Sequence, residues 1–136
     1  MRKTATINGI FLAITVALGL ASRLYGHILP FAIAEYAGDT LWATAMFFLL
    51  RLIRPAASRH ALAAVALAIA LLVEFSQLAH PAWLDAFRRQ PGVGLVLGYD
   101  FVSTDLACYV AGVALAWAID AVRQEWTRQR RINPTD

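Results

Sequence analysis

Charged residues are scarce in this chain of 136 residues, and so is cysteine. Asp, Glu, Lys and Arg make up 15% of the sequence, whereas an ordinary soluble domain carries about 25%. The single cysteine, Cys108, excludes a disulfide scaffold and a cysteine-rich zinc site, so we expect it to be a small packing residue. The motifs G-x-S-x-G and H-E-x-x-H are also missing. His27 and His80 match no ligand spacing, so neither a metal nor another cofactor is predicted.

Hydrophobic residues, by contrast, make up 60% of the chain, more than so small a soluble domain could hide from water. Four apolar stretches stand out, and each approaches the roughly 20 residues that cross a hydrocarbon core. They cover about 7–22, 40–53, 61–79 and 106–122. The sequence therefore predicts an all-α fold, a single transmembrane domain built as an integral membrane four-helix bundle. The second stretch is short alone, and residues 31–37 could extend it.

The basic residues predict the orientation of these helices, because cytoplasmic flanks retain Lys and Arg. If the helices alternate across the membrane, nine of the twelve Lys and Arg residues fall on one side, and only Arg23, Arg88 and Arg89 fall on the other. We therefore expect both termini in the cytoplasm, including a basic tail at 123–136, and no nucleic-acid partner for that tail. An alternative is a signal peptide cleaved near 19–22, which would leave three helices.

The outer connection between the third and fourth helices has an unusual composition. Around 81–89 it mixes aromatic and charged residues, which suits a short helix lying in the headgroup region. The glycine-rich stretch 91–99 that follows is apolar but too short to span the membrane. It could re-enter the bundle only where protein satisfies its backbone. We therefore predict an interfacial or re-entrant segment here.

Small residues recur every four positions in three of the four stretches, a spacing that lets helix backbones approach closely in lipid. The three stripes are Gly9, Ala13, Ala17 and Ala21; Ala66 and Ala70; and Gly112 and Ala116. We predict that these stripes face the bundle interior.

Glu74 is the most informative polar residue, because ionisable groups inside membrane segments are costly. It shares a helix face with Ala66, Ala70 and Gln77, and it lies near a helix carboxyl end, where an anion is disfavoured. It must therefore be protonated, hydrogen-bonded by Gln77 or a similar group, or paired with a cation. Arg23 is at the matching depth, with Arg88 and Arg89 as further candidates. A purely structural ion pair is the alternative.

Polar groups from all four helices converge on the extracytoplasmic end. Asp39 and Asp105 can also be explained as caps, because each follows turn residues at the start of an expected helix. The candidate ligand-binding residues are Arg23, Asp39, Glu74, Gln77, Asp105 and Tyr109. An enzyme would use Glu74 as the acid/base and Asp105 as its electrostatic partner. The other readings are a small oligomeric transporter and a scaffold without a ligand.

Four blocks carry a family resemblance: GDTLWATAMFFLLRLI from Gly38, VEFSQL from Val73, PAWLDAFR from Pro81 and DLACYVAG from Asp105. In this order they resemble small bacterial membrane proteins of domain-of-unknown-function family 2809. Glu74-x-x-Gln77 and the later Asp105-x-x-x-Tyr109-x-x-Gly112 are more distantly similar to VanZ-like proteins, although Tyr109 replaces an Asn of that pattern.

The resemblances imply a multi-pass protein of a bacterial inner membrane and no defined activity. VanZ-like proteins are associated with reduced susceptibility to glycopeptide antibiotics at the cell envelope, but fold resemblance does not transfer that phenotype. We therefore expect the polar groups at the extracytoplasmic end to bind a polar or lipid-linked envelope component, with the lipid bilayer as the surrounding partner.

Overall fold

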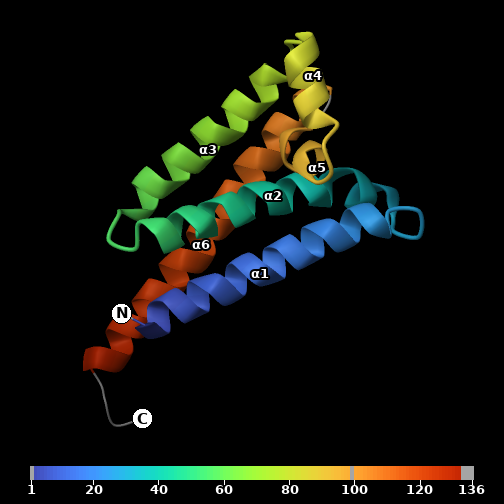
Figure 1. Cartoon of the computed structure of the whole chain (residues 1–136). Coiled ribbons are helices and arrows are strands. Elements are labelled where there is room, and N and C mark those ends of the chain that lie inside the picture. The colour runs from blue at the N-terminus through green and yellow to red at the C-terminus, as the bar shows by residue number, and fades with distance from the viewer. Residues whose placement is uncertain (1, 99, 133–136) are drawn as a thin grey trace.

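The computed structural model describes residues 2–98 and 100–132, and the fold in this part of the chain is all-α. Four long helices form the body of the molecule (Figure 1). They are α1 (Arg2–Leu24), α2 (Phe31–Ile53), α3 (Arg59–Ser76) and α6 (Ser103–Ile132), and the short helices α4 (Ala82–Arg88) and α5 (Val93–Leu97) join α3 to α6. The first residues of α1 and the last turns of α6 lie at one end, away from α4 and α5 (Figure 1).

Three of the long helices are long and apolar enough to cross a membrane: Ala5–Leu24, Arg59–Ser76 and Ser103–Arg130. The chain is therefore a membrane protein by helix length and composition. The second expected stretch lies within α2, which begins at Phe31 and so includes the extension through 31–37. The helix α2, which carries Glu35, Asp39 and Arg51, is not among these three, so its membrane crossing stays a prediction.

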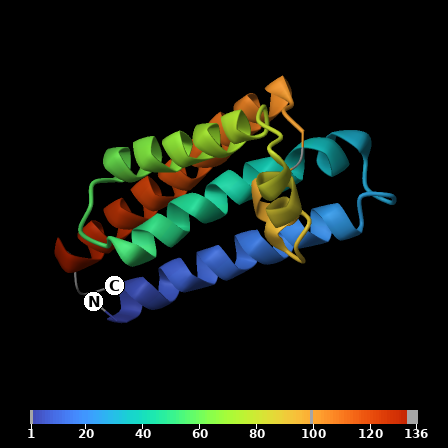
Figure 2. The same ribbon diagram turned by 45° about the horizontal axis from the view of Figure 1, so that its top comes forward.

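The packing explains how α2 tolerates polar residues. It lies between α1 and the pair formed by α3 and α6, and it contacts all three (Figures 1 and 2). Its side chains Phe47 and Phe48 are fully buried, and Phe48 stacks on Phe11 of α1 with 5.1 Å between ring centroids. The inner faces of α2 therefore meet protein rather than lipid.

Close helix contact confirms two of the three small-residue stripes. Ala66 and Ala70 of α3 are fully buried, as is Ala116 of α6. At Gly112, a Cβ atom would overlap the carbonyl oxygen of Thr40, and the Thr44 hydroxyl donates a 2.9 Å hydrogen bond to the Gly112 carbonyl oxygen. The α2 and α6 backbones therefore touch at this point. Cys108 is also buried, in agreement with a packing role.

The stripe predicted on α1 is wrong, because Ala13 and Ala17 are exposed. The buried face of α1 instead carries Asn8, Thr15 and Ser22, which recur every seven residues. Thr15 and Ser22 can face protein because their hydroxyls donate to carbonyl oxygens of the preceding turn. Polar residues that satisfy themselves locally, rather than alanines, mark the packed side of this helix.

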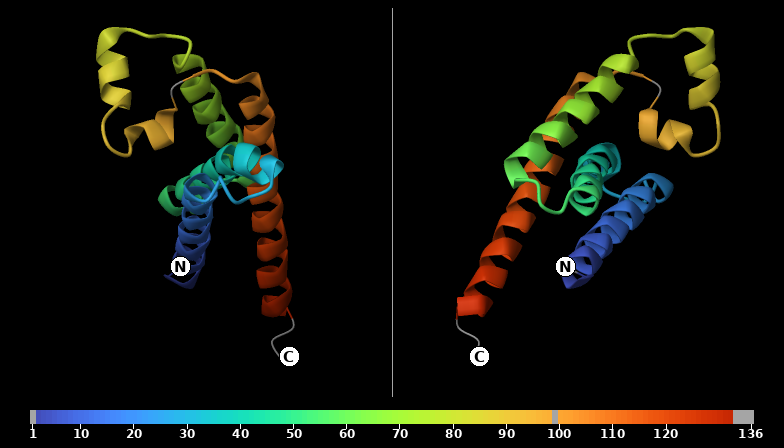
Figure 3. Two further views of the ribbon diagram at one scale, coloured as in Figure 1. Left: turned by 90° about the vertical axis from the view of Figure 1, so that its right-hand side faces the viewer. Right: turned by 60° about the vertical axis from the view of Figure 1, so that its left-hand side comes forward.

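Several expected boundaries also move. The last helix does not end at 122 but continues to Ile132, so most of the expected basic tail is helical. The third helix ends at Ser76 rather than 79. The outer connection contains α4, as predicted for the short helix, and α5 follows within the stretch 91–99, of which residue 99 lies outside the described residues. Figure 3 shows both short helices projecting beside the end of α3; their depth in a membrane stays a prediction.

Candidate functional site

Glu74 lies in the last turn of α3 and is fully buried. One carboxylate oxygen, Oε2, accepts a 2.9 Å hydrogen bond from the Tyr109 hydroxyl of α6. The other, Oε1, accepts a 2.9 Å hydrogen bond from the backbone N–H of Val102, just before α6 begins. Glu74 therefore ties the end of α3 to the start of α6.

Of the alternatives open for Glu74, the structure shows hydrogen bonds, and it does not show the ion pair with Arg23 among the described residues. The Arg23 guanidinium instead bonds to Asp39 of α2 at 2.9 Å, joining α1 to α2. Asp39 is not a helix cap, because α2 begins two turns earlier, at Phe31. Asp105, in contrast, does lie in the first turn of α6, where the helix dipole favours a carboxylate.

Arg88, another candidate partner for Glu74, closes the end of α3 instead. Its side chain is 1% exposed and donates to the carbonyl oxygens of Ser76 at 2.6 Å and Ala79 at 3.1 Å. Ser76 is the last residue of α3, and its carbonyl is one that a helix terminus leaves without an intrahelical partner. Arg88 also lies 3.3 Å from Asp85. The expected cation near Glu74 is therefore present in the fold but stabilises the backbone rather than the carboxylate.

Gln77 connects α3 to α5. Its Nε2 donates a 2.8 Å hydrogen bond to the Leu97 carbonyl oxygen, which fixes the orientation of the amide. Gly98 follows at φ +63, and a Cβ there would overlap the Gln77 amide, so glycine is required for two independent reasons. Gln77 is 4% exposed, and its Oε1 has no hydrogen-bond partner among the described residues. A buried acceptor is therefore left open.

A polar cavity of about 140 Å³ lies where these residues meet. Five of the six predicted ligand-binding residues line it, and they come from all four long helices or their ends: Arg23, Asp39, Gln77, Asp105 and Tyr109. The sixth, Glu74, lies behind Tyr109 and holds the Tyr109 hydroxyl. Asp100, which sequence analysis missed, also lines the cavity. Its position could not be predicted, because the irregular path before α6 brings it there.

The electrostatics of this cavity are one-sided. Three carboxylates line it, from Asp39, Asp100 and Asp105, and Arg23 is the only guanidinium that does so among the described residues. Because Arg23 is already bonded to Asp39, two carboxylates remain without a cationic partner in the cavity. The cavity can therefore accept hydrogen bonds and compensate a positive charge. No group of three or more His, Cys, Asp or Glu side chains in the described part of the chain is arranged to hold a metal ion.

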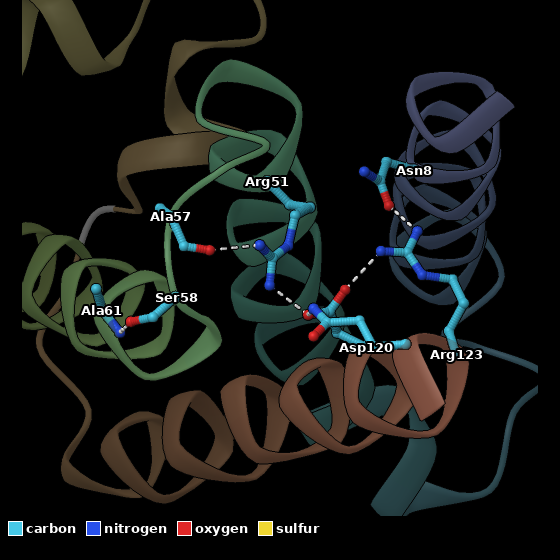
Figure 4. A network of polar contacts seen from close by, with 8 residues as sticks. Asn8, Arg51, Ala57, Ser58, Ala61, Asp120 and Arg123 are labelled. Carbon is cyan, nitrogen blue, oxygen red and sulfur yellow. Dashed lines mark hydrogen bonds and ion pairs between the residues drawn. The ribbon is translucent and has the colours of Figure 1, made fainter. Parts of the chain in front are cut away.

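A second buried polar cluster, which sequence analysis also missed, lies near the other end of the bundle (Figure 4). Asp120 of α6 is fully buried and paired with Arg51 of α2 and Arg123 of α6, and it accepts a 2.6 Å bond from Gln124. Arg123 also bonds to Asn8 of α1. We call these residues, Asn8, Arg51, Asp120, Arg123 and Gln124, the Asp120 cluster. They join α1, α2 and α6.

The sequence contains a signal for this cluster. Gly112, Ala116 and Asp120 continue the four-residue spacing of the buried face of α6 by one more turn. Arg51 and Arg123 belong to the nine Lys and Arg residues that predict the membrane orientation, a pattern that indicates no partner for either of them. The structure shows both guanidiniums bonded to Asp120 instead.

Residues 28–113 match the family DUF2809, described as protein of unknown function. This is more than half of the chain, so the chain belongs to that family, as its sequence blocks indicated. The matched region includes Asp39, Glu74, Gln77, Asp105 and Tyr109, whereas Asn8 and Asp120 lie outside it. No solved structure matches the chain. The more distant resemblance to VanZ-like proteins stays a prediction.

Proposed function

We propose that this membrane protein binds a polar or lipid-linked component of the cell envelope in the cavity beside Glu74. The observation that carries the proposal is the mismatch inside the cavity: three carboxylates line it with one arginine that is already paired, and the lining residue Gln77 has a buried oxygen without a partner among the described residues. Buried polar groups ordinarily find partners. A ligand with a positively charged N–H group would supply both the missing donors and the missing charge.

The proposal places this cavity on the extracytoplasmic side of a bacterial inner membrane, with α2 as the fourth crossing helix and both termini in the cytoplasm. The support is the distribution of Lys and Arg, which are concentrated at the ends of the long helices away from the cavity. The arrangement also puts the first residues of α1 and the last turns of α6 at the same end of the bundle.

The geometry favours binding over acid–base catalysis by Glu74. A general acid or base must reach the reacting proton directly or through one water molecule. Glu74 is fully buried and does not line the cavity, and its two oxygens accept hydrogen bonds from Tyr109 and Val102. In this proposal Glu74 is a positioning residue, and Asp105 is the carboxylate that contacts the ligand.

The test compares two carboxylates on the same helix. Asp105 lines the cavity, whereas Glu125 is exposed further along α6. We would measure binding of glycerophosphoethanolamine, a soluble amine-bearing probe, by calorimetry to detergent-purified wild type, Asp105→Asn and Glu125→Gln. Asp105→Asn is expected to weaken binding about tenfold, the effect of losing one charge-assisted hydrogen bond, and Glu125→Gln is expected to leave it unchanged.

The same three proteins, purified with native lipid, would be compared by mass spectrometry of the copurified small molecules. A species depleted only from Asp105→Asn would identify the natural ligand. If wild type does not bind the probe and all three proteins retain identical species, the cavity is not a binding site and the proposal fails.

A further inference from the structure

An apolar groove adjoins the polar cavity. The groove lies between α1 and α2, has a volume of about 260 Å³ and is lined mainly by aliphatic side chains, among them Leu12, Val16, Leu20, Leu41 and Leu49. Arg23, Trp42 and Val96 line both the groove and the polar cavity, so the two adjoin at these residues. From Arg23 to Leu12 the groove follows α1 for eleven residues, or roughly 16 Å. That length is about half of a roughly 30 Å hydrocarbon core, which is the depth of one leaflet.

The charged groups occur in a fixed order along this combined site. The aliphatic groove comes first, the guanidinium of Arg23 stands at the junction, and the carboxylates of Asp100 and Asp105 lie beyond it. Arg23 donates one hydrogen bond to Asp39, and its side chain is 38% exposed, so part of the guanidinium is accessible to a second anion. The order apolar, cationic, anionic is complementary to a molecule whose parts run acyl chain, phosphate, ammonium.

We infer that the ligand is an aminophospholipid. One acyl chain occupies the groove between α1 and α2, the phosphate lies against Arg23, and the ammonium group lies in the polar cavity. This inference rests on the proposed function and names its ligand class. Gln77 Oε1 and the Asp105 carboxylate accept N–H hydrogen bonds from the ammonium group.

The open Gln77 oxygen predicts a specific preference. It is a buried acceptor, so it favours a headgroup that donates hydrogen bonds and not one that only carries positive charge. A primary ammonium has N–H donors, whereas a trimethylammonium has none. The site is therefore expected to distinguish phosphatidylethanolamine from phosphatidylcholine, and to reject phosphatidylglycerol because its headgroup adds no cation.

The experiment is native mass spectrometry of the detergent-purified protein with an equimolar mixture of these three lipids, all with the same acyl chains. We expect wild type to bind phosphatidylethanolamine about tenfold more tightly than either other lipid. Equal occupancy by the three lipids would overturn the inference, because ordinary boundary lipid binds without headgroup preference.

Groove variants separate the acyl chain from the headgroup. A Cβ at Gly19 would meet only Leu41 Cβ, at 3.6 Å, so Gly19→Leu is expected to fill the groove while the helix is retained. It should lower phosphatidylethanolamine binding about tenfold but leave glycerophosphoethanolamine binding unchanged. Ala45→Leu fills the same groove from α2 and serves as a second variant, with helicity and thermal unfolding checked for both.

The outcomes distinguish this inference from the proposed function. If the soluble probe binds and depends on Asp105, but both groove variants retain full lipid binding, the cavity binds a ligand and the acyl-chain assignment is wrong. If binding of the probe and binding of every lipid are unaffected by Asp105→Asn, both proposals are wrong. Loss of lipid binding in the groove variants together with an intact probe site supports the inference.

Discussion

The carboxylate of Asp120 and the carboxylates around the polar cavity are separated along α6 by about 22 Å, since fifteen residues divide Asp105 from Asp120. Asp120 is paired with two arginines, and two buried donors beside it, Asn8 Nδ2 and Arg51 Nε, have no partner in the described part of the chain. At the cavity the ratio is reversed, because three carboxylates line it with one arginine, and the lining residue Gln77 has an acceptor, Oε1, without a partner among the same residues.

This difference separates a structural polar cluster from the proposed binding site. At Asp120 both carboxylate oxygens are bonded to side chains of α2 or α6, and Arg123 extends the cluster to Asn8 of α1, so the cluster holds these three helices together. At the cavity, Asp39 is paired with Arg23, whereas Asp100 and Asp105 line the open space without a cationic partner among the described residues. A buried charge does not by itself indicate a binding function. What indicates it is whether the carboxylates in a cluster outnumber the cations that pair with them.

Replacement of Asp120 by alanine is the strongest test of this comparison. The substitution leaves Arg51, whose side chain is 4% exposed, without a carboxylate, which costs roughly 3–5 kcal/mol of unfolding free energy in comparable buried pairs. Denaturant unfolding in mixed micelles would measure the loss. Asp105→Asn is the matched control and should cost less than about 1 kcal/mol. Equal losses in the two variants would show that the clusters do not differ as described.

The second test concerns Glu74, which belongs to the cavity end but is itself satisfied. Glu74→Ala removes the acceptor of both the Tyr109 hydroxyl and the Val102 N–H, and each unsatisfied buried group costs about 1–3 kcal/mol. Glu74→Gln keeps an oxygen for Val102 and presents an N–H group that the Tyr109 oxygen can accept. We expect it to cost only about 1 kcal/mol by the same unfolding measurement. A glutamine variant as unstable as the alanine variant would mean that the charge itself is required.

A third test examines the contact between α2 and α6 that lies between the two polar ends. Gly112→Ala places a Cβ against the Thr40 backbone and 3.0 Å from Ala43 Cβ, and overpacking of this kind costs about 1–3 kcal/mol. Gly9→Ala meets nothing within 4 Å and should be neutral or stabilising by up to about 1 kcal/mol. Thermal unfolding followed by circular dichroism compares the pair. If both variants unfold alike, the close helix approach does not contribute to stability.

Local pattern predicted the helices and the inward face of α3, because apolar length and four-residue spacing depend on neighbouring residues. The same pattern predicted that the six candidate residues lie at one end of the long helices. It did not predict their pairing, since the partner of Glu74 depends on the path of α4 and α5, which returns Val102 to the end of α3. The sequence analysis missed Asp120 for another reason: the count of Lys and Arg uses Arg51 and Arg123 only as signals of membrane orientation, whereas the structure pairs both with this buried carboxylate.

The smallest expected effect comes from comparing two ion pairs by double-mutant cycles. Arg23 and Asp39 are paired at 2.9 Å, but the Arg23 side chain is 38% exposed and the Asp39 side chain 21% exposed. Such a pair contributes about 0.2–1 kcal/mol of coupling energy in a cycle of Arg23→Gln with Asp39→Asn. A cycle of Arg51→Met with Asp120→Leu should give several-fold more, because neither group can reach solvent once its partner is removed. A large coupling at Arg23 would mean that this arginine is committed to Asp39 and is not available to a ligand phosphate, so the measurement tests the binding site as well as the stability of the fold.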